Sequence, residues 1–183
     1  MTVDPDQLKI QLYPTPVLRI KASPVEYSPN VREVGVRMIE IMSQADGIGL
    51  AAPQVGLSWM MFVARVPADE TRSPDASPPS ASLEPEVFIN PEIVRVKGLP
   101  ETMAEGCLSL PGVLGEVTRR PTVVIRALDL EGNAFEKTAT GLLARCYQHE
   151  YDHLMGVMII DKMAQADLRK NKNFLKHMEK RDR

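Results

Sequence analysis

The spacing of apolar residues predicts a helix in the first quarter of the chain. Residues 28–30, Ser-Pro-Asn, offer a capping side chain and a proline suited to a first turn. Apolar residues then recur at helical spacing, which places them on one face. This stripe consists of Val34, Met38, Ile41 and Met42. Asp-Gly at 46–47 ends the helix, and the three prolines within residues 8–27 predict an extended arm before it.

Short apolar or alternating runs predict strands through the middle of the chain. They are residues 59–64, 88–91, 92–96, 116–120, 122–128, 134–140 and 157–160. Val94 and Val96 alternate with charged residues, the pattern of a half-buried strand. A turn at 129–133 makes the two runs that flank it the arms of a hairpin.

Two more helices are expected after these strands. One covers 142–155 and ends at Gly156, and the other covers 164–180, with Leu168, Leu175 and Met178 on its inner face. Strands in runs followed by helices predict an α+β fold with mixed, mostly antiparallel sheets around the 142–155 helix and with a C-terminal helix.

Length and composition indicate one domain, residues 1–183, with an ordinary globular core. The stretch 67–86 carries five prolines and several serines and predicts a flexible, solvated insertion loop. A net charge of −2 gives no reason to expect broad nucleic-acid binding. No apolar run reaches the ~20 residues of a membrane span. No secretory signal opens the chain, and two cysteines do not indicate a disulfide framework, so we expect a cytoplasmic protein.

Residues 149–153 read His-Glu-x-x-His within the predicted helix at 142–155. The four-residue spacing puts His149 and His153 on one helix face, about one turn apart. Two imidazoles so placed can hold one metal ion, with Glu150 beside it to pass protons. The alternative is a surface helix that carries two histidines without a metal.

A catalytic metal usually has three protein ligands, so a third donor is needed. Cys146 shares the helix face but is seven residues from His153, about 10.5 Å along the axis, which is too far for one ion. It is therefore a pocket-lining or core residue. Cys107 follows a glycine and precedes a turn, and this placement favours it over His177, which lies among lysines. Spacing leaves both candidates open, and a buried free cysteine is the plain alternative for Cys107.

Three stretches in order resemble the signature motifs of peptide deformylases. They are 47–54 (Gly-Ile-Gly-Leu-Ala-Ala-Pro-Gln), 105–109 (Glu-Gly-Cys-Leu-Ser) and 148–153 (Gln-His-Glu-Tyr-Asp-His). Residues 13–19 are similar to the N-terminal arm of that family, so the resemblance covers roughly residues 10–163.

The resemblance implies a metal site and a set of catalytic groups. The metal ligands it implies are Cys107, His149 and His153, and the metal is Fe(II) in the cell, with zinc or nickel able to replace it. The reaction it implies is removal of the formyl group from the N-terminal methionine of new polypeptides, with release of formate. Water activated by the metal attacks the formyl carbon, and Glu150 acts as general base and acid. The Gln54 amide and the Leu108 backbone N–H stabilise the oxyanion.

The resemblance also implies how the peptide binds. The loop at Ile48 and Gly49 pairs its backbone with the substrate chain as an added strand does. The methionine side chain enters a pocket formed by Ile48, Met103, Glu105, Leu142 and Cys146. The segment 112–116 lacks an arginine that some bacterial members place near the substrate, which puts peptide anchoring at this end in doubt.

The C-terminal helix is rich in basic residues. They are Arg169, Lys170, Lys172, Lys176, Lys180, Arg181 and Arg183, against Glu179 and Asp182. In bacterial family members such a helix docks on the ribosome, and a solvated helix end is the alternative. No membrane contact and no sequence-specific nucleic-acid binding are expected.

Two rival functions stay open on the sequence. One is a metalloprotease that cleaves internal peptide bonds and uses another third ligand. The other is a non-catalytic relative that binds a partner. The full set of ligands, base and amide argues against the second, because decay usually removes these residues first.

Overall fold

The computed structural model describes residues 2–181, and Asp182 and Arg183 of the predicted basic set lie outside them. The larger sheet has five strands, β1 (Gly49–Ala51), β2 (Met61–Ala64), β3 (Glu86–Lys97), β6 (Thr122–Leu128) and β7 (Ala134–Thr140), in the order β1-β2-β3-β6-β7. A hairpin of β4 (Glu101–Glu105) and β5 (Gly115–Arg119) forms the second sheet. The helices are α1 (Pro29–Gln44), α2 (Gly141–Leu154) and α3 (Gln165–Arg181). All strand pairs are antiparallel, so the predicted α+β class is confirmed.

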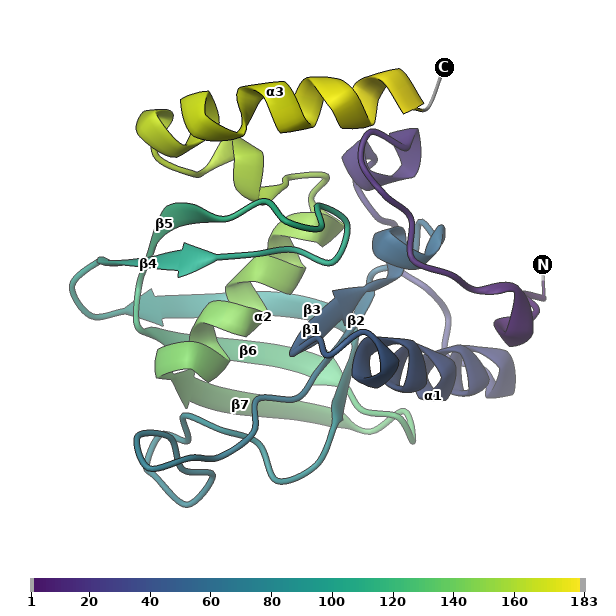
Figure 1. Ribbon diagram of the computed structural model, residues 1–183. Coiled ribbons are helices and arrows are strands. Elements are labelled where there is room, and N and C mark those ends of the chain that lie inside the picture. The colour runs from purple at the N-terminus through teal and green to yellow at the C-terminus, as the bar shows by residue number, and fades with distance from the viewer. Residues whose placement is uncertain (1, 182–183) are drawn as a thin grey trace.

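Helix α2 lies between the two sheets and is the centre of the molecule (Figure 1). It packs on β1, β2, β6 and β7. Phe62 and Phe88 stack with ring centroids 4.5 Å apart, and Tyr147 of α2 lies 4.7 Å from the Phe88 ring. All three side chains are fully buried. Burial of such rings is the main favourable contribution that fixes the helix on the sheet.

Gly156 ends α2 through a close backbone approach. Its φ of +72° suits glycine, and an added Cβ would lie 2.6 Å from the carbonyl oxygen of Arg19. The N-terminal arm and the end of α2 therefore touch directly, and Ala22 N–H donates to the Leu154 carbonyl at 2.8 Å. This contact holds the C-terminal turn of α2, which carries His153.

Helix α1 packs beside β1 and β2 and buries the predicted apolar stripe. The Ser28 side chain accepts a hydrogen bond from Val31 N–H at 3.4 Å, so the predicted start is confirmed.

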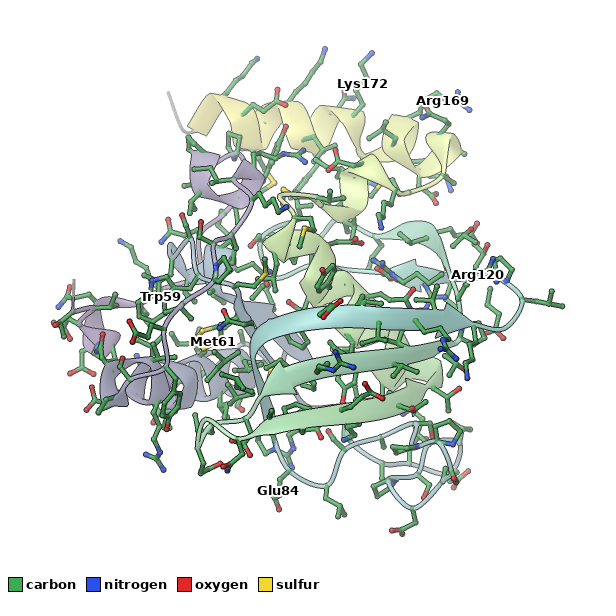
Figure 2. All side chains as sticks on the ribbon, turned by 180° about the vertical axis from the view of Figure 1, so that it is seen from behind. Trp59, Met61, Glu84, Arg120, Arg169 and Lys172 are labelled. Atoms are coloured by element: carbon green, nitrogen blue, oxygen red, sulfur yellow. The ribbon has the colours of Figure 1, made fainter. Side chains whose placement is uncertain are left out.

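Helix α3 covers the loop that follows β4 (Figure 1). The same helix lies beside the N-terminal arm at residues 13–19. Leu175 and Met178 are buried against Leu110 and Val113. Asn171 donates a hydrogen bond to the Leu114 carbonyl at 2.9 Å. From behind, Arg169 and Lys172 project away from the body of the protein (Figure 2).

Several predicted elements differ from the structure. Residues 88–96 belong to one long strand, β3, whose irregularity near Asn90 accommodates Pro91. The predicted strand at 157–160 is wrong, because Ile159–Asp161 forms a 3-10 helix with the Asp161 carboxylate accepting from Met158 N–H at 2.8 Å. An apolar run of four cannot distinguish the two conformations. The short strands β1 and β4 were not predicted.

The proline-rich loop has no regular element between β2 and β3, as its composition predicts. It is anchored where Thr140 N–H donates to the Pro79 carbonyl at 2.9 Å and Ser82 N–H to the Val66 carbonyl at 2.8 Å. Its flexibility stays a prediction. Within residues 2–181, no helix has the length and apolar content that crossing a membrane requires.

The aromatic contact between α2 and the sheet predicts a large loss of stability on truncation. Phe88→Ala should lower the free energy of unfolding by about 3–5 kcal/mol, because it leaves a cavity beside Tyr147. Urea denaturation of the variant and the wild type measures this loss. Leu99→Ala is the control, since Leu99 is 84% exposed and its truncation should change stability by less than about 0.5 kcal/mol. Equal losses in the two variants would contradict this account of the core.

Candidate metal centre

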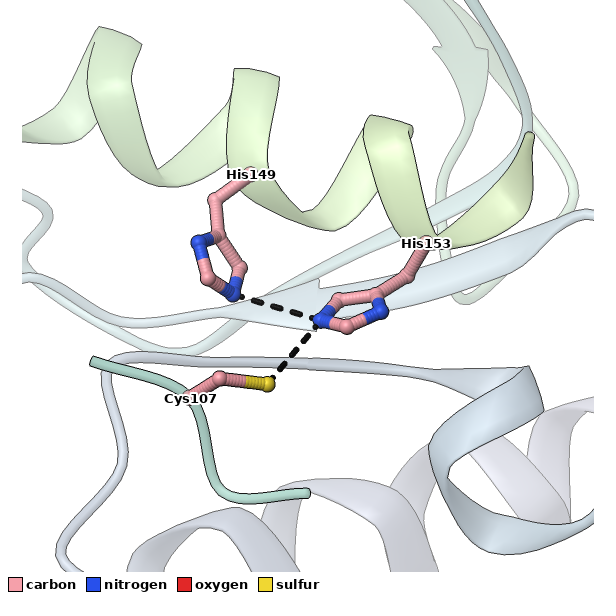
Figure 3. Close-up of side chains that lie close together, drawn as sticks. All are labelled: Cys107, His149 and His153. Carbon is pink, nitrogen blue, oxygen red and sulfur yellow. Dashed lines mark hydrogen bonds between the residues drawn. The ribbon is translucent and has the colours of Figure 1, made fainter. Parts of the chain in front are cut away.

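Helix α2 and the turn after β4 bring three metal donors together. The ligand atoms of Cys107, His149 and His153 all lie within 4.8 Å of one another. The Nε2 atom of His153 is 3.2 Å from the Cys107 Sγ and 3.2 Å from the His149 Nε2 (Figure 3). Bonds of ~2.0–2.3 Å from one tetrahedral ion separate its donors by roughly 3.3–3.8 Å. A thiolate and two imidazoles so placed fit a first-row transition metal.

The alternative third donor, His177, is exposed on α3 and does not belong to this cluster. Cys146 is buried on α2, and its thiol donates to the Ile48 carbonyl at 3.2 Å instead of joining the donors. Burial lowers the pKa of His153 well below its usual value. The His153 imidazole is therefore neutral, the form that binds a metal.

A buried ionic network supports His149 from behind. The Glu105 Oε2 lies 3.0 Å from the His149 Nδ1, which leaves Nε2 to face the other donors. Arg119 holds the same carboxylate with two bonds of 2.6 and 2.9 Å, and Arg145 adds a third at 2.7 Å. Asp152 accepts a further bond from Arg119 at 2.8 Å. Glu105, Arg119 and Arg145 in this network thus each have an oppositely charged partner.

The charge of Glu105 follows from this network. Burial alone would raise the pKa of its carboxyl group, but hydrogen bonds from Arg119 and His149 outweigh burial and hold the pKa well below its usual value. Arg145 also donates to the backbone carbonyls of Val117 and Glu101, each at 2.8 Å. Arg145 therefore connects α2 to both strands of the hairpin, and Cys107 lies between these strands in the chain.

Glu150 has the opposite environment. Its side chain is buried, and its Oε2 has no hydrogen-bond partner among the described residues. Burial raises its pKa to about 7. A carboxyl group with this pKa can take up and release a proton near neutral pH.

A pocket of about 350 Å³ opens beside these groups. The predicted site residues that line it are Ile48, Gly49, Gln54, Glu105, Cys107, Leu108, Leu142, Cys146, His149 and Glu150. His153 belongs to the donor cluster but not to the lining. Met103 is 46% exposed on β4 and does not line the pocket. Both carboxylate oxygens of Glu105 are engaged by the network and are not free for a ligand.

The Gln54 amide is held in one orientation. Its Oε1 accepts from Ala51 N–H at 2.8 Å, and its Nε2 donates to the Ser109 hydroxyl at 3.3 Å and lies 3.5 Å from the Cys107 Sγ. The NH₂ group therefore faces the metal donors. Gln54 is buried, so this orientation is fixed by the protein rather than by solvent.

The edge of β1 offers backbone groups to the pocket. Arg65 N–H donates to the Ile48 carbonyl at 2.8 Å, so residues 48 and 65 form a hydrogen-bonded pair. Bonded and non-bonded pairs alternate in an antiparallel ladder, and Gly49 pairs with Ala64. The N–H and C=O of Gly49 therefore point away from β2, toward the pocket side.

The sequence prediction missed the residues that surround the ligands, above all Arg119, Arg145 and Asp152. Two signals were present. Arg145 lies four residues before His149, on the same helix face. Alternation in β5 places Arg119 on the buried side with Val117.

Comparisons with known proteins match this chain to one family. Residues 7–169 match the family model described as polypeptide deformylase. A peptide deformylase from Chromohalobacter salexigens is 41% identical over 178 residues, covering 97% of this chain and 96% of the relative. One from Desulforudis audaxviator is 40% identical over 155 residues, covering 84% and 92%.

Solved structures agree as well. The crystal structure of peptide deformylase from Ehrlichia chaffeensis has a TM-score of 0.85 and 32% identity, covering 96% of this chain and 98% of that one. The crystal structure from Thermotoga maritima has a TM-score of 0.75 and 37% identity, covering 86% and 97%. The resemblance of the three motifs is confirmed, and this chain belongs to the peptide deformylase family.

Proposed function

We propose that this enzyme removes the formyl group from the N-terminal formylmethionine of newly made polypeptides and releases formate. The observation that carries the proposal is the meeting of three metal donors, a buried carboxyl group and an oriented amide in one pocket. Cys107, His149 and His153 would hold the metal, which we propose is Fe(II) in the cell, with zinc or nickel able to replace it. When bound, the metal supplies Lewis-acid activation of water and of the formyl oxygen.

Glu150 is the proposed proton carrier. It accepts a proton from the attacking water and later delivers it to the departing amine. Its pKa of about 7 supports both steps at neutral pH, because neither protonation state is strongly favoured. No hydrogen bond competes for its Oε2 among the described residues, so the carboxyl group is available to water and substrate.

Gln54 and Leu108 are the proposed donors to the developing oxyanion. The Gln54 NH₂ group is fixed toward the donor cluster before substrate arrives. A donor that is already oriented loses little free energy to reorganisation during the reaction. Leu108 follows Cys107 and lines the same pocket, so its backbone N–H would lie beside the metal.

The peptide backbone would pair with the free edge of β1. Gly49 supplies the N–H and C=O that face the pocket, and the methionine side chain would lie against Leu142 and Cys146. Recognition through backbone groups tolerates varied sequence after the methionine. Met103 is exposed on β4 and does not line the pocket, so the pocket gives no support to a contact between Met103 and the methionine side chain of the substrate.

We also propose that α3 contacts the ribosome in the cytoplasm, where nascent chains appear. Five of its cationic side chains are exposed, those of Arg169, Lys170, Lys172, Lys176 and Lys180, and Arg169 and Lys172 project outward (Figure 2). Its apolar side is occupied by the protein core. The basic face is therefore free to meet phosphate groups without disturbing the active site.

Removal of the proposed proton carrier tests the reaction. Glu150→Ala should retain its metal, because no ligand is changed, and should lose about 10²–10⁴-fold in turnover, because proton transfer is lost. Metal content and formate release from formyl-Met-Ala-Ser measure the two effects. Glu84→Ala, at an exposed loop position (Figure 2), is the control and should behave as the wild type. Full activity of Glu150→Ala, or cleavage of internal peptide bonds without preference for a formyl group, would contradict the proposal.

Loss of the carboxylate behind His149 should weaken metal binding. Glu105→Gln keeps the shape but removes the charge that orients the imidazole, and metal affinity should fall about 10–100-fold. Competition with a chelator measures this change. The metal-free variant should also be destabilised, by about 3–5 kcal/mol, because two buried arginines lose the charge of the carboxylate that they share. Glu136→Gln is the control, since its pair with Arg126 is exposed. Unchanged affinity in Glu105→Gln would refute the orienting role.

Charge reversal on α3 tests the ribosome contact. The variant carries glutamate at three exposed positions, Lys172, Lys176 and Lys180. It should lose the salt-sensitive association with ribosomes that the wild type shows in co-sedimentation. Formate release from a free formyl peptide should not change.

A control for net charge carries glutamate at three exposed lysines away from α3. They are Lys9, Lys21 and Lys97. If both triple variants bind ribosomes equally well, or if wild-type binding does not depend on salt, the proposed contact of α3 is wrong.

A further inference from the structure

The backbone of β1 closely approaches the side chain of Glu150 at Gly49. A Cβ added to Gly49 would lie 2.2 Å from the Glu150 Oε1, 2.6 Å from its Cδ and 2.8 Å from its Cγ. Non-bonded atoms do not approach so closely. Any side chain at position 49 would therefore displace the carboxyl group of Glu150.

The backbone conformation of Gly49 does not require glycine. Its φ is not in the left-handed region, unlike that of Gly56 or Gly156, so alanine could adopt the same backbone. The closest constraint on this position is Glu150, since the three atoms nearest to the added Cβ all belong to that residue.

Packing, not hydrogen bonding, holds the Glu150 carboxyl group. Among residues 2–181, no protein group donates a hydrogen bond to it, and its Oε2 is buried without a partner. The neighbouring Cys146 thiol is engaged by the Ile48 carbonyl. The backbone of Gly49 is thus a close contact that limits where the carboxyl group lies.

We propose that Gly49 is a positioning residue for the reaction: its missing side chain lets the Glu150 carboxyl group lie against β1 and face the pocket. This inference rests on the proposed acid–base role of Glu150. It assigns Gly49 a role beyond that of offering backbone groups to the peptide, and the two roles predict different kinetics.

Gly49→Ala is the direct test. The atoms that must move are the end of a flexible side chain, so the variant should fold with wild-type stability and keep its metal. Because the carboxyl group is displaced by about an ångström or more, kcat for formyl-Met-Ala-Ser should fall about 100-fold. The affinity for the product peptide Met-Ala-Ser, measured by calorimetry, should change little. A crystal structure of the variant should show the carboxyl group moved from residue 49.

Two further variants separate this role from its alternatives. Gly35→Ala also adds a methyl group to a buried glycine, here in α1, where the added Cβ would lie 3.0 Å from the end of the Leu130 side chain. This variant should keep wild-type kcat. Glu150→Ala removes all three of the contacting atoms, Cγ, Cδ and Oε1. In the Glu150→Ala background, Gly49→Ala should therefore cost much less of the remaining kcat than it costs in the wild type, a non-additive result expected when residue 49 acts through Glu150.

The possible results distinguish failure of the positioning role of Gly49 from failure of the proposed function. A Gly49→Ala variant with wild-type kcat, or with a loss confined to KM and product affinity, would overturn the positioning role. Equal losses of kcat in both backgrounds would overturn it too. An active Glu150→Ala variant would instead refute the proposed function itself.

Discussion

A negative charge buried at Glu105 is the constraint on which the metal site depends. This carboxylate can stay ionised inside the protein only because Arg119, Arg145 and His149 surround it. The partners come from β5 and α2, while Glu105 itself ends β4. Satisfying one buried charge therefore draws the hairpin onto the helix. Cys107 follows Glu105 by two residues, so the same ionic contacts bring the thiol to the imidazoles.

Helix α2 connects the hydrophobic core to the metal site because its two faces have different partners. Tyr147 packs on the aromatic pair of the sheet, and burial of these rings fixes the depth of the helix. His149 and His153 lie on the face toward the hairpin. A shift of α2 along its axis would cost core packing and would also separate the donors. The apolar cluster thus gives the metal site its rigidity.

The sequence predicted the features that are local in the chain. The stripe of α1 and the spacing of His149 and His153 follow from helical periodicity, which one segment contains in full. The strand β4 escaped prediction because its residues are mostly polar and exposed, and it exists through pairing with β5. The network around Glu105 joins residues 14 to 44 positions apart in the chain. The sequence alone does not show whether an arginine is buried or solvated. Contacts of this kind are set by the tertiary fold.

Glu105 and Glu150 show how one site gives two carboxyl groups opposite properties. Hydrogen bonds from Arg119 and His149 lower the pKa of Glu105 despite its burial, which suits a fixed orienting charge. Glu150 is buried without such bonds, and its pKa rises to about 7. A proton carrier must exchange its proton and yet keep its position. Hydrogen bonds that fixed Glu150 in place would also stabilise one protonation state. Contact with the backbone of β1 at Gly49 restricts the position of the carboxyl group without favouring one protonation state. The close contact therefore sets the position of the group, and burial sets its pKa.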